Sequence, residues 1–200
     1  SNVTRVCAYD RAGLGWSDLG PESQDVFQNA EALHSLLQKA GATGPYILVG
    51  HSFGGLYVRA YADQYPDEVA GMVLIEATDP DALKVQGKQD VMPGADPGMM
   101  LMGPWAARTG LLRLARLFQV TGDLPEQQQA ELNAYYASTR FYETLKRQFD
   151  LFPTLLAEVR QTGSLGSRPL VVVLGSKGDG GREELRSLFE QQAALSMRRR

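Results

Sequence analysis

Cysteine is almost absent from this sequence, which has one, Cys7, among 200 residues. A single cysteine cannot form a disulfide within the chain, so nothing in the sequence calls for an oxidising compartment. We therefore expect a cytoplasmic protein. Cys7 lies in an apolar run, and we expect its side chain to pack in the core.

Strong charge of one sign and long apolar runs are also missing. Charged residues make up 22% of the chain and the net charge is −3, so we expect no nucleic-acid partner. No uninterrupted apolar stretch approaches the roughly 20 residues of a membrane-spanning helix. No residues have metal-ligand spacing or a complete dinucleotide fingerprint, and we expect no metal or organic cofactor.

The sequence does contain enough apolar residues for one domain with a core, since 44% of them are hydrophobic. Apolar runs typical of buried strands alternate with helical patterns. The predicted strands are 3–9, 46–50, 69–76 and 169–175, and the predicted helices between and after them are 22–40, 53–65 and 181–195. Apolar strands separated by helices are typical of a parallel sheet covered on both faces, so we predict an α/β fold.

Between about residues 80 and 166 there is no strand pattern, and helical periods are broken by glycine and proline. The predicted helices here are 110–118, one that begins with a capping box formed by Asp123 and Glu126, and 141–160. We interpret this segment as an inserted helical cap. The predicted domains are thus 1–79 for the core sheet, 80–166 for the cap and 167–200 for the rest of the core. Methionines of the cap could line an adaptable site for acyl or alkyl groups, or belong to its core.

The most informative motif is Gly-His-Ser-Phe-Gly, residues 50–54, between the apolar run 46–49 and a helical pattern. A serine on so tight a strand-to-helix turn has a strained backbone and is held at the mouth of a pocket. We expect that a Cβ at Gly50 or Gly54 would crowd the neighbouring elements. The alternative is a glycine-rich turn with an incidental serine at position 52.

Segments on both sides of this motif resemble the α/β-hydrolase superfamily. Residues 6–18 are similar to the strand and loop that precede its nucleophile, and residues 65–75 to the segment that follows it. The resemblance is close over residues 3–80 and loose over 168–190. It implies that Ser52 is a nucleophile for esterase-like or peptidase-like acyl transfer, because dehalogenases and epoxide hydrolases of this superfamily have an aspartate there.

The resemblance also implies the partners that the serine needs. The backbone N–H of Phe53 would form half of the oxyanion hole. Asp179, in the loop after the last predicted strand, is the expected acid, although Gly-Asp-Gly is also ordinary turn chemistry. Glu76 and Asp79, after the strand 69–76, are the alternatives. Asp10 is expected instead to hold its own loop in shape.

The sequence offers no suitable histidine base for Ser52, because the chain has only two histidines and neither is expected to reach the serine hydroxyl. His51 adjoins Ser52 and its side chain should point away from that of the serine. His34 lies on the predicted helix 22–40, where a structural role is expected. In the superfamily the base follows one more strand beyond the helix 181–195, and the second oxyanion donor lies in a loop before the segments seen here.

We therefore expect an internal fragment of a serine hydrolase that is inactive alone. The substrate would be a carboxylic ester or related acyl compound, cleaved through an acyl-serine intermediate. The alternative is a non-catalytic protein that binds a small ligand on the same scaffold. An aminopeptidase would need an acidic patch in the cap, whereas the charges there are mixed.

Overall fold

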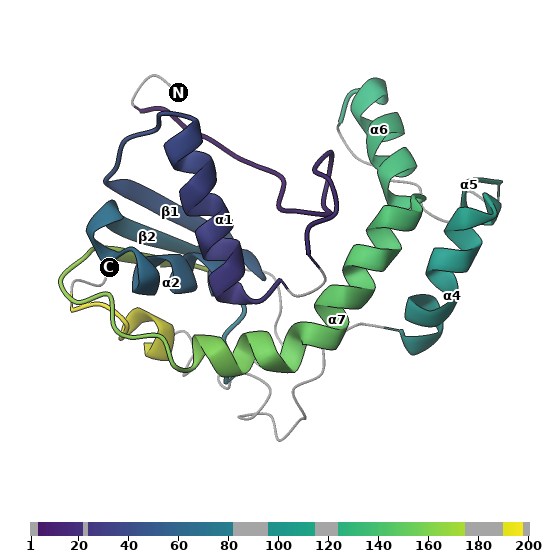
Figure 1. Ribbon diagram of the computed structural model, residues 1–200. Helices are drawn as coiled ribbons and strands as arrows, with labels where there is room; N and C mark the ends of the chain where they lie inside the picture. The colour runs from purple at the N-terminus through teal and green to yellow at the C-terminus, as the bar shows by residue number, and fades with distance from the viewer. Residues whose placement is uncertain (1–3, 22–23, 82–95, 115–123, 175–189, 198–200) are drawn as a thin grey trace. The chain divides into compact units, whose positions relative to one another are not determined.

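The computed structural model describes residues 4–21, 24–81, 96–114, 124–174 and 190–197 (Figure 1). The chain forms two compact units, one of residues 1–23 with 92–150 and one of residues 24–91 with 151–200. The boundaries of these two units differ from the boundaries of the three predicted domains. Residues 1–23 group with helices, and residues 151–166 group with the sheet.

The sheet of the second unit has three parallel strands in the order β1-β2-β3. Their bounds are Tyr46–His51 for β1, Val69–Ile75 for β2 and Leu170–Val173 for β3. In the register, His51 lies opposite Ile75, and Ile75 lies opposite Val173. All three strands therefore end at the same edge of the sheet. The predicted parallel α/β arrangement and these three strands are confirmed.

Two helices of this unit cover one face of the sheet: α1, Val26–Lys39, and α2, Gly54–Gln64. Figure 1 shows them side by side next to the strands. The short helix η1, Pro66–Glu68, follows α2. Buried side chains between α2 and the sheet form the core, namely Leu48, Leu56, Ala60, Tyr61, Met72, Leu74 and Leu170. Their burial is the main contribution that holds the strands in register.

The opposite face of the sheet differs from the prediction of a sheet covered on both faces. Alternate residues of β1, Ile47 and Val49, are 67% and 58% exposed, and Val171 and Val173 of β3 are exposed too. Side chains alternate between the two faces of a strand, so these residues share the face away from Leu48. On that face, these side chains of β1 and β3 are therefore exposed to solvent.

The bounds of α1 follow from its terminal residues. The Asp25 side chain accepts a hydrogen bond from the N–H of Gln28 at 2.7 Å, which satisfies a donor that the first turn leaves unpaired. At the other end Gly41 has φ +60°, a conformation that favours glycine, and Ala42 N–H donates to the Leu37 carbonyl at 3.0 Å. The predicted end of the helix 22–40 is thus confirmed, one residue beyond Lys39.

The predicted strand at 3–9 is wrong. Residues 5–10 have no regular structure, Val6 is 77% exposed, and Cys7 is exposed rather than packed in the core. A strand needs a neighbour that pairs with its backbone groups, and an apolar run does not by itself supply one. Among the described strands, β1 pairs with β2 alone.

The first unit contains α4, Pro97–Arg108, α5, Leu111–Leu114, α6, Glu126–Tyr136, and the first part of α7, Thr139–Val159. Its core is formed by Ala107, Leu112, Ala137 and Tyr142, with Met99, Ala106 and Phe141 packed around them. The predicted helices 110–118 and 141–160 correspond to α5 and α7, although 115–118 lie outside the described residues. The predicted capping box is wrong, since the residue before α6 is Pro125, and no side chain caps it.

Residues 10–20 form a loop that the start of α7 holds in place. Arg140 donates to the carbonyls of Gly15 and Ser17 at 3.0 and 3.2 Å, and Thr144 donates to that of Gly13 at 3.0 Å. Within the loop, the Asp10 carboxylate accepts from the N–H of Trp16 at 3.1 Å. The expected role of Asp10, to hold its own loop, is confirmed.

Among the helices of the described ranges, none has both the length and the apolar character that crossing a bilayer requires.

Candidate active site

The turn at Ser52 joins β1 to α2 with only two residues between them. β1 ends at His51 and α2 begins at Gly54, so Ser52 and Phe53 alone make the change of direction. Ser52 has φ +50°, which a residue with a side chain rarely adopts and which costs about 1–3 kcal/mol. The tight strand-to-helix turn that the motif predicts is therefore present, with the strain at the serine itself.

Backbone hydrogen bonds hold Ser52 in this conformation. Its N–H donates to the Ile75 carbonyl at 3.2 Å, and its own carbonyl accepts from the N–H groups of Gly55 and Thr78 at 3.1 and 3.0 Å. β2 and the residues after it thus fix the serine from one side and α2 from the other. The side chain is half-buried, and no residue in the described part of the chain forms a hydrogen bond with its hydroxyl.

Two glycines make this turn possible, but only one is among those predicted. A Cβ on Gly50 would lie 2.7 Å from the carbonyl C and O of Gly54, so that position has no room for a side chain. At Gly54 the prediction is wrong, because a Cβ there would meet nothing within 4 Å. The second close approach is at Gly55, whose Cβ would lie 2.5 Å from that of Ala77. Gly55 lets α2 pack against the segment after β2.

The backbone N–H of Phe53 lies where the N-terminus of α2 leaves donors unpaired. No acceptor for this N–H occurs among the residues that the structure describes. The positive end of the helix dipole and free N–H groups favour negative charge at this position. The Phe53 ring packs against Phe152 with ring centroids 5.3 Å apart, which fixes the residue. The arrangement can therefore stabilise an oxyanion next to the serine hydroxyl.

The predicted acids have different surroundings. Asp179, the first choice, lies outside the described residues. Glu76 is the first residue after β2, is exposed, and has φ +42°. Asp79 is partly buried and accepts a hydrogen bond from the N–H of Asp81 at 2.8 Å. Burial raises the pKa of Asp79, while that hydrogen bond and the charge of Arg59 lower it.

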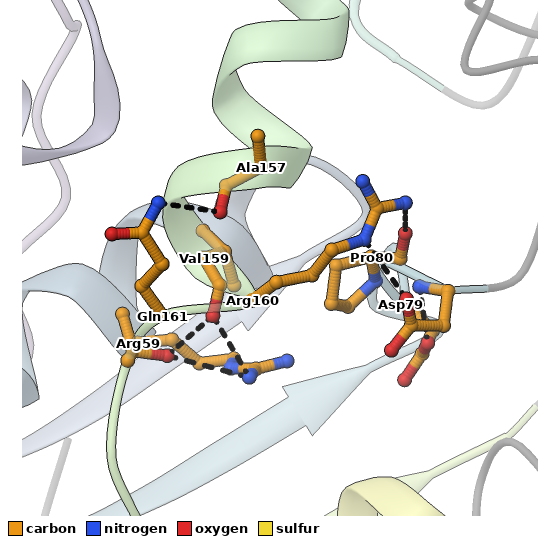
Figure 2. A network of polar contacts seen from close by, with 9 residues as sticks. Arg59, Asp79, Pro80, Ala157, Val159, Arg160 and Gln161 are labelled. Atoms are coloured by element: carbon orange, nitrogen blue, oxygen red, sulfur yellow. Dashed lines mark hydrogen bonds and ion pairs between the residues drawn. The ribbon is translucent and has the colours of Figure 1, made fainter.

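Asp79 belongs to a polar network that also includes Arg59 of α2 and Arg160, as Figure 2 shows. Arg59 of α2 donates to the Val159 carbonyl and the Thr162 hydroxyl, both at 3.3 Å. Arg160 donates to the Asp81 carboxylate at 2.8 Å and to the Pro80 carbonyl. Burial lowers the pKa of Arg59, and the nearby carboxylates of Asp79 and Asp81 oppose that shift.

This network ties the segment after β2 to α2 and to the residues that follow α7. Sequence reasoning missed Arg59 and Arg160 altogether. The available signal was the position of Arg59 within the apolar stretch 56–62 of α2, since a charged residue there needs a buried partner.

Among the described residues, neither His34 nor His51 forms a hydrogen bond with the Ser52 hydroxyl. His34 Nδ1 lies 3.1 Å from Glu68 Oε2 and its Nε2 lies 2.8 Å from Gln38 Nε2. Its ring also stacks on Tyr65 with centroids 4.1 Å apart. Both ring nitrogens and one ring face are therefore engaged, in agreement with a structural role. His51 is exposed at the end of β1. No cluster of potential metal ligands occurs among the described residues.

Comparison with known protein families gives a match to this chain. The sequence model of the α/β hydrolase fold family matches residues 1–101, which include β1, the turn at Ser52, α2 and β2. An uncharacterized protein of Schizosaccharomyces pombe is 39% identical over 42% of this chain and 16% of its own length. The bifunctional esterase/perhydrolase DCH of Acinetobacter calcoaceticus is 37% identical over 44% of this chain and 32% of its own length. The chain thus spans at most about a third of either relative.

The structure is similar to solved structures over nearly its whole length. A loop variant of haloalkane dehalogenase DbeA from Bradyrhizobium elkanii matches with a TM-score of 0.60 and 17% identity, over 94% of this chain and 68% of that one. At this identity the likeness shows the fold alone.

Proposed function

Because the chain belongs to the α/β hydrolase fold family, we propose that Ser52 is the nucleophile of a serine hydrolase that cleaves carboxylic esters or related acyl compounds. The observation that carries the proposal is the backbone of Ser52, strained at φ +50° between a parallel strand and a helix. Strain of this kind persists only where the surrounding structure enforces it, and it is concentrated at functional sites. An esterase among the relatives supports the choice of substrate class.

The proposed reaction follows from the groups around the serine. Ser52 Oγ attacks the carbonyl carbon while a histidine accepts the hydroxyl proton. The N–H of Phe53 donates to the oxyanion of the tetrahedral intermediate. Collapse breaks the bond to the alcohol, which takes the proton from the histidine and leaves an acyl-serine. Water then cleaves the acyl-serine by the same steps, and the histidine returns to its neutral form.

The histidine would come from outside these 200 residues. His34 is held between Glu68 and Gln38, and its ring nitrogens are not available to Ser52. The base also needs a carboxylate that fixes its tautomer. Asp179 is the residue that the family resemblance implies, and Glu76 and Asp79 are the alternatives.

The experiment that tests this proposal is covalent labelling of the whole protein with a fluorophosphonate probe, followed by identification of the modified peptide. We expect the adduct on Ser52. Ser52→Ala should abolish labelling and reduce the hydrolysis of a short p-nitrophenyl ester by roughly 10⁴–10⁶-fold. Ser35→Ala is the matched control, because Ser35 is also half-buried but lies on α1, and it should leave both unchanged.

The same probe distinguishes the hydrolase from a non-catalytic ligand-binding protein. A properly folded whole protein that shows no labelling and no ester turnover would favour the binding protein. Labelling at any residue other than Ser52 would refute the assignment of the nucleophile.

We also propose that the 200-residue chain alone has negligible esterase activity, since it would lack the base. Turnover of the same ester by this chain, abolished by Ser52→Ala, would refute this.

A further inference from the structure

One side of α4 is explained by packing within the first unit. Ala107 belongs with Tyr142 of α7 to the core of that unit, and Met99 packs against the same core. Gly103 lies between them along the helix, and a Cβ on Gly103 would clash with the Tyr142 ring. These three residues of α4 follow one another at intervals of four, so they share one side of the helix. That side is the packed side of α4.

The opposite side of α4 is also apolar, and it is exposed. An α-helix turns by about 100° per residue, so Leu101 and Trp105 project on the side away from Gly103. Leu101 is 74% exposed and Trp105 is 58% exposed. A surface helix of a globular protein normally has charged or polar residues opposite its packed side. Large apolar side chains in their place indicate a surface that binds a partner.

The exposed apolar side chains continue beyond Trp105. Met102 of α4 is also exposed, and α5 follows α4 directly (Figure 1). Leu111 and Leu114 of α5 are three residues apart and therefore share one side of that helix, and Leu114 is 84% exposed. Leu112 between them belongs to the core of the unit. We name the exposed apolar residues of the two helices the α4–α5 surface: Leu101, Met102, Trp105, Leu111 and Leu114.

The charge of this segment is positive, whereas the net charge of the chain is −3. Residues 97–122 contain no aspartate or glutamate, and they contain Arg108, Arg113 and Arg116. Arg108 donates to the Glu143 carboxylate of α7 at 3.1 Å, so its charge is balanced. Arg113 is exposed and forms no ion pair within the part of the chain that the structure describes. The α4–α5 surface therefore has an unbalanced positive charge beside it, which favours a negatively charged partner.

We propose that the α4–α5 surface binds to a membrane surface that contains anionic lipids. Its apolar side chains suit the boundary between headgroups and acyl chains, and the tryptophan ring suits the headgroup region. Arg113 would lie near the negatively charged headgroups.

The charge favours lipid over a second copy of this chain. In a symmetric dimer the same surface meets itself, which would bring the arginine of one copy close to that of the other. The inference goes beyond the proposed hydrolase and does not depend on it, because no group of the Ser52 turn takes part.

The test is co-sedimentation of the whole protein with vesicles of phosphatidylcholine alone or of phosphatidylcholine mixed with phosphatidylserine. We expect tighter binding to the mixed vesicles, and we expect this preference to weaken as the salt concentration rises. Trp105→Ser should lower the affinity for the mixed vesicles by roughly tenfold or more, because a large apolar side chain no longer leaves water. Arg113→Gln should lower it by about fivefold, and only for the mixed vesicles.

Trp16 provides the matched control. It is also largely exposed, but it lies in the loop 10–20 and outside the α4–α5 surface. Trp16→Ser should leave vesicle binding unchanged. The thermal unfolding midpoint of each variant, measured in parallel, verifies that the protein is folded.

Tryptophan fluorescence supplies a second measurement. A tryptophan that moves from water into the headgroup region shifts its emission to shorter wavelength. The shift on addition of mixed vesicles should be lost in Trp105→Phe and kept in Trp16→Phe.

Several outcomes would overturn the inference. Equal binding to the two kinds of vesicle would refute the anionic partner, and unchanged binding of Trp105→Ser would refute the role of this surface. If the protein binds no vesicles but self-associates in sedimentation velocity, and Trp105→Ser abolishes the association, the surface belongs to a second copy. If Trp105→Ser raises KM for a soluble ester and leaves vesicle binding unchanged, the surface binds substrate instead of lipid.

Discussion

Replacement of Gly50 by alanine should destabilise the protein, whereas replacement of Gly54 should not. The two glycines flank Ser52 symmetrically, and neither has a positive φ, so backbone conformation does not distinguish them. Space does. A Cβ added at Gly50 would lie 2.7 Å from the Gly54 carbonyl group and 2.8 Å from Gly55 N. Carbon atoms in favourable contact are roughly 3.5–4.0 Å apart.

The magnitude follows from which atoms must move. All three are backbone atoms of the first turn of α2, so relief requires a shift of the helix by several tenths of an ångström or more. Overpacking of this kind costs about 1–3 kcal/mol. Alanine in place of Gly54, where a Cβ meets nothing within 4 Å, should instead stabilise α2 by at most about 1 kcal/mol.

Urea unfolding of the two variants and of the wild type, followed by far-UV circular dichroism, measures both free energies. The thermal midpoint of the Gly50→Ala variant should fall by roughly 2–12 °C, since each kcal/mol shifts it by about 2–4 °C in a chain of this size. Equal stability of the two variants, or a larger loss at Gly54 than at Gly50, would refute the steric reasoning.

Three further predictions concern polar contacts. Burial raises the pKa of Asp79 above 3.8 in the folded protein. The free energy of unfolding of the wild type should therefore fall, relative to that of Asp79→Asn, as the pH rises from 3.8 through the folded-state pKa. Urea unfolding of both proteins at several pH values measures these free energies, and a wild type that gains stability relative to the variant over this range would contradict the prediction. Tyr61→Phe removes the hydroxyl that donates to Glu68 and lowers the pKa of its carboxyl. We expect a loss of about 1 kcal/mol at neutral pH in thermal unfolding, smaller than for a buried charge because Glu68 is one-third exposed. The loss should shrink as the pH falls below 4.5 through the folded-state pKa, and a pH-independent loss would argue against the carboxylate as acceptor. Asp10→Ala should raise the hydrogen-exchange rate of the Trp16 amide by roughly 2–10-fold, since one hydrogen bond is lost; an unchanged rate would show that the rest of the loop suffices.

Local patterns in the sequence were sufficient for the elements that surround Ser52. The apolar run 46–49 and the glycine-rich motif after it predict β1, the turn and α2, because strand, turn and helix each have their own residue preferences. The end of α1 was similarly predictable, since Gly41 ends the helix with a positive φ, whereas α1 begins at Val26 rather than at the predicted residue 22. These features depend on residues close to one another in the chain.

The run 3–9 shows where such patterns fail. Its residues have the apolar character of a buried strand, yet Val6 is largely exposed in an irregular segment. Whether an apolar run becomes a strand depends on a partner with free backbone groups, and nothing within the run specifies that partner. Cys7 was misplaced for the same reason.

The relation of Glu76 to Ser52 could be predicted only in part. The sequence places both residues at strand ends, but the register that puts them at the same level is a property of the pairing between β1 and β2. The different surroundings of Glu76 and Asp79 could not be predicted either. They depend on Arg59, which itself forms hydrogen bonds with residues about 100 positions further along the chain. Asp179 lies outside the described residues, so its position stays a prediction.

The left-handed backbone at position 52 has an evolutionary consequence. Glycine would adopt that conformation without strain, so Ser52→Gly should be more stable than Ser52→Ala by about 1 kcal/mol. A lineage that no longer uses the hydroxyl would gain stability by drifting to glycine at this turn. Relatives without hydrolytic activity should therefore show glycine there more often than active ones do, and a survey that pairs sequence with measured activity would reveal it.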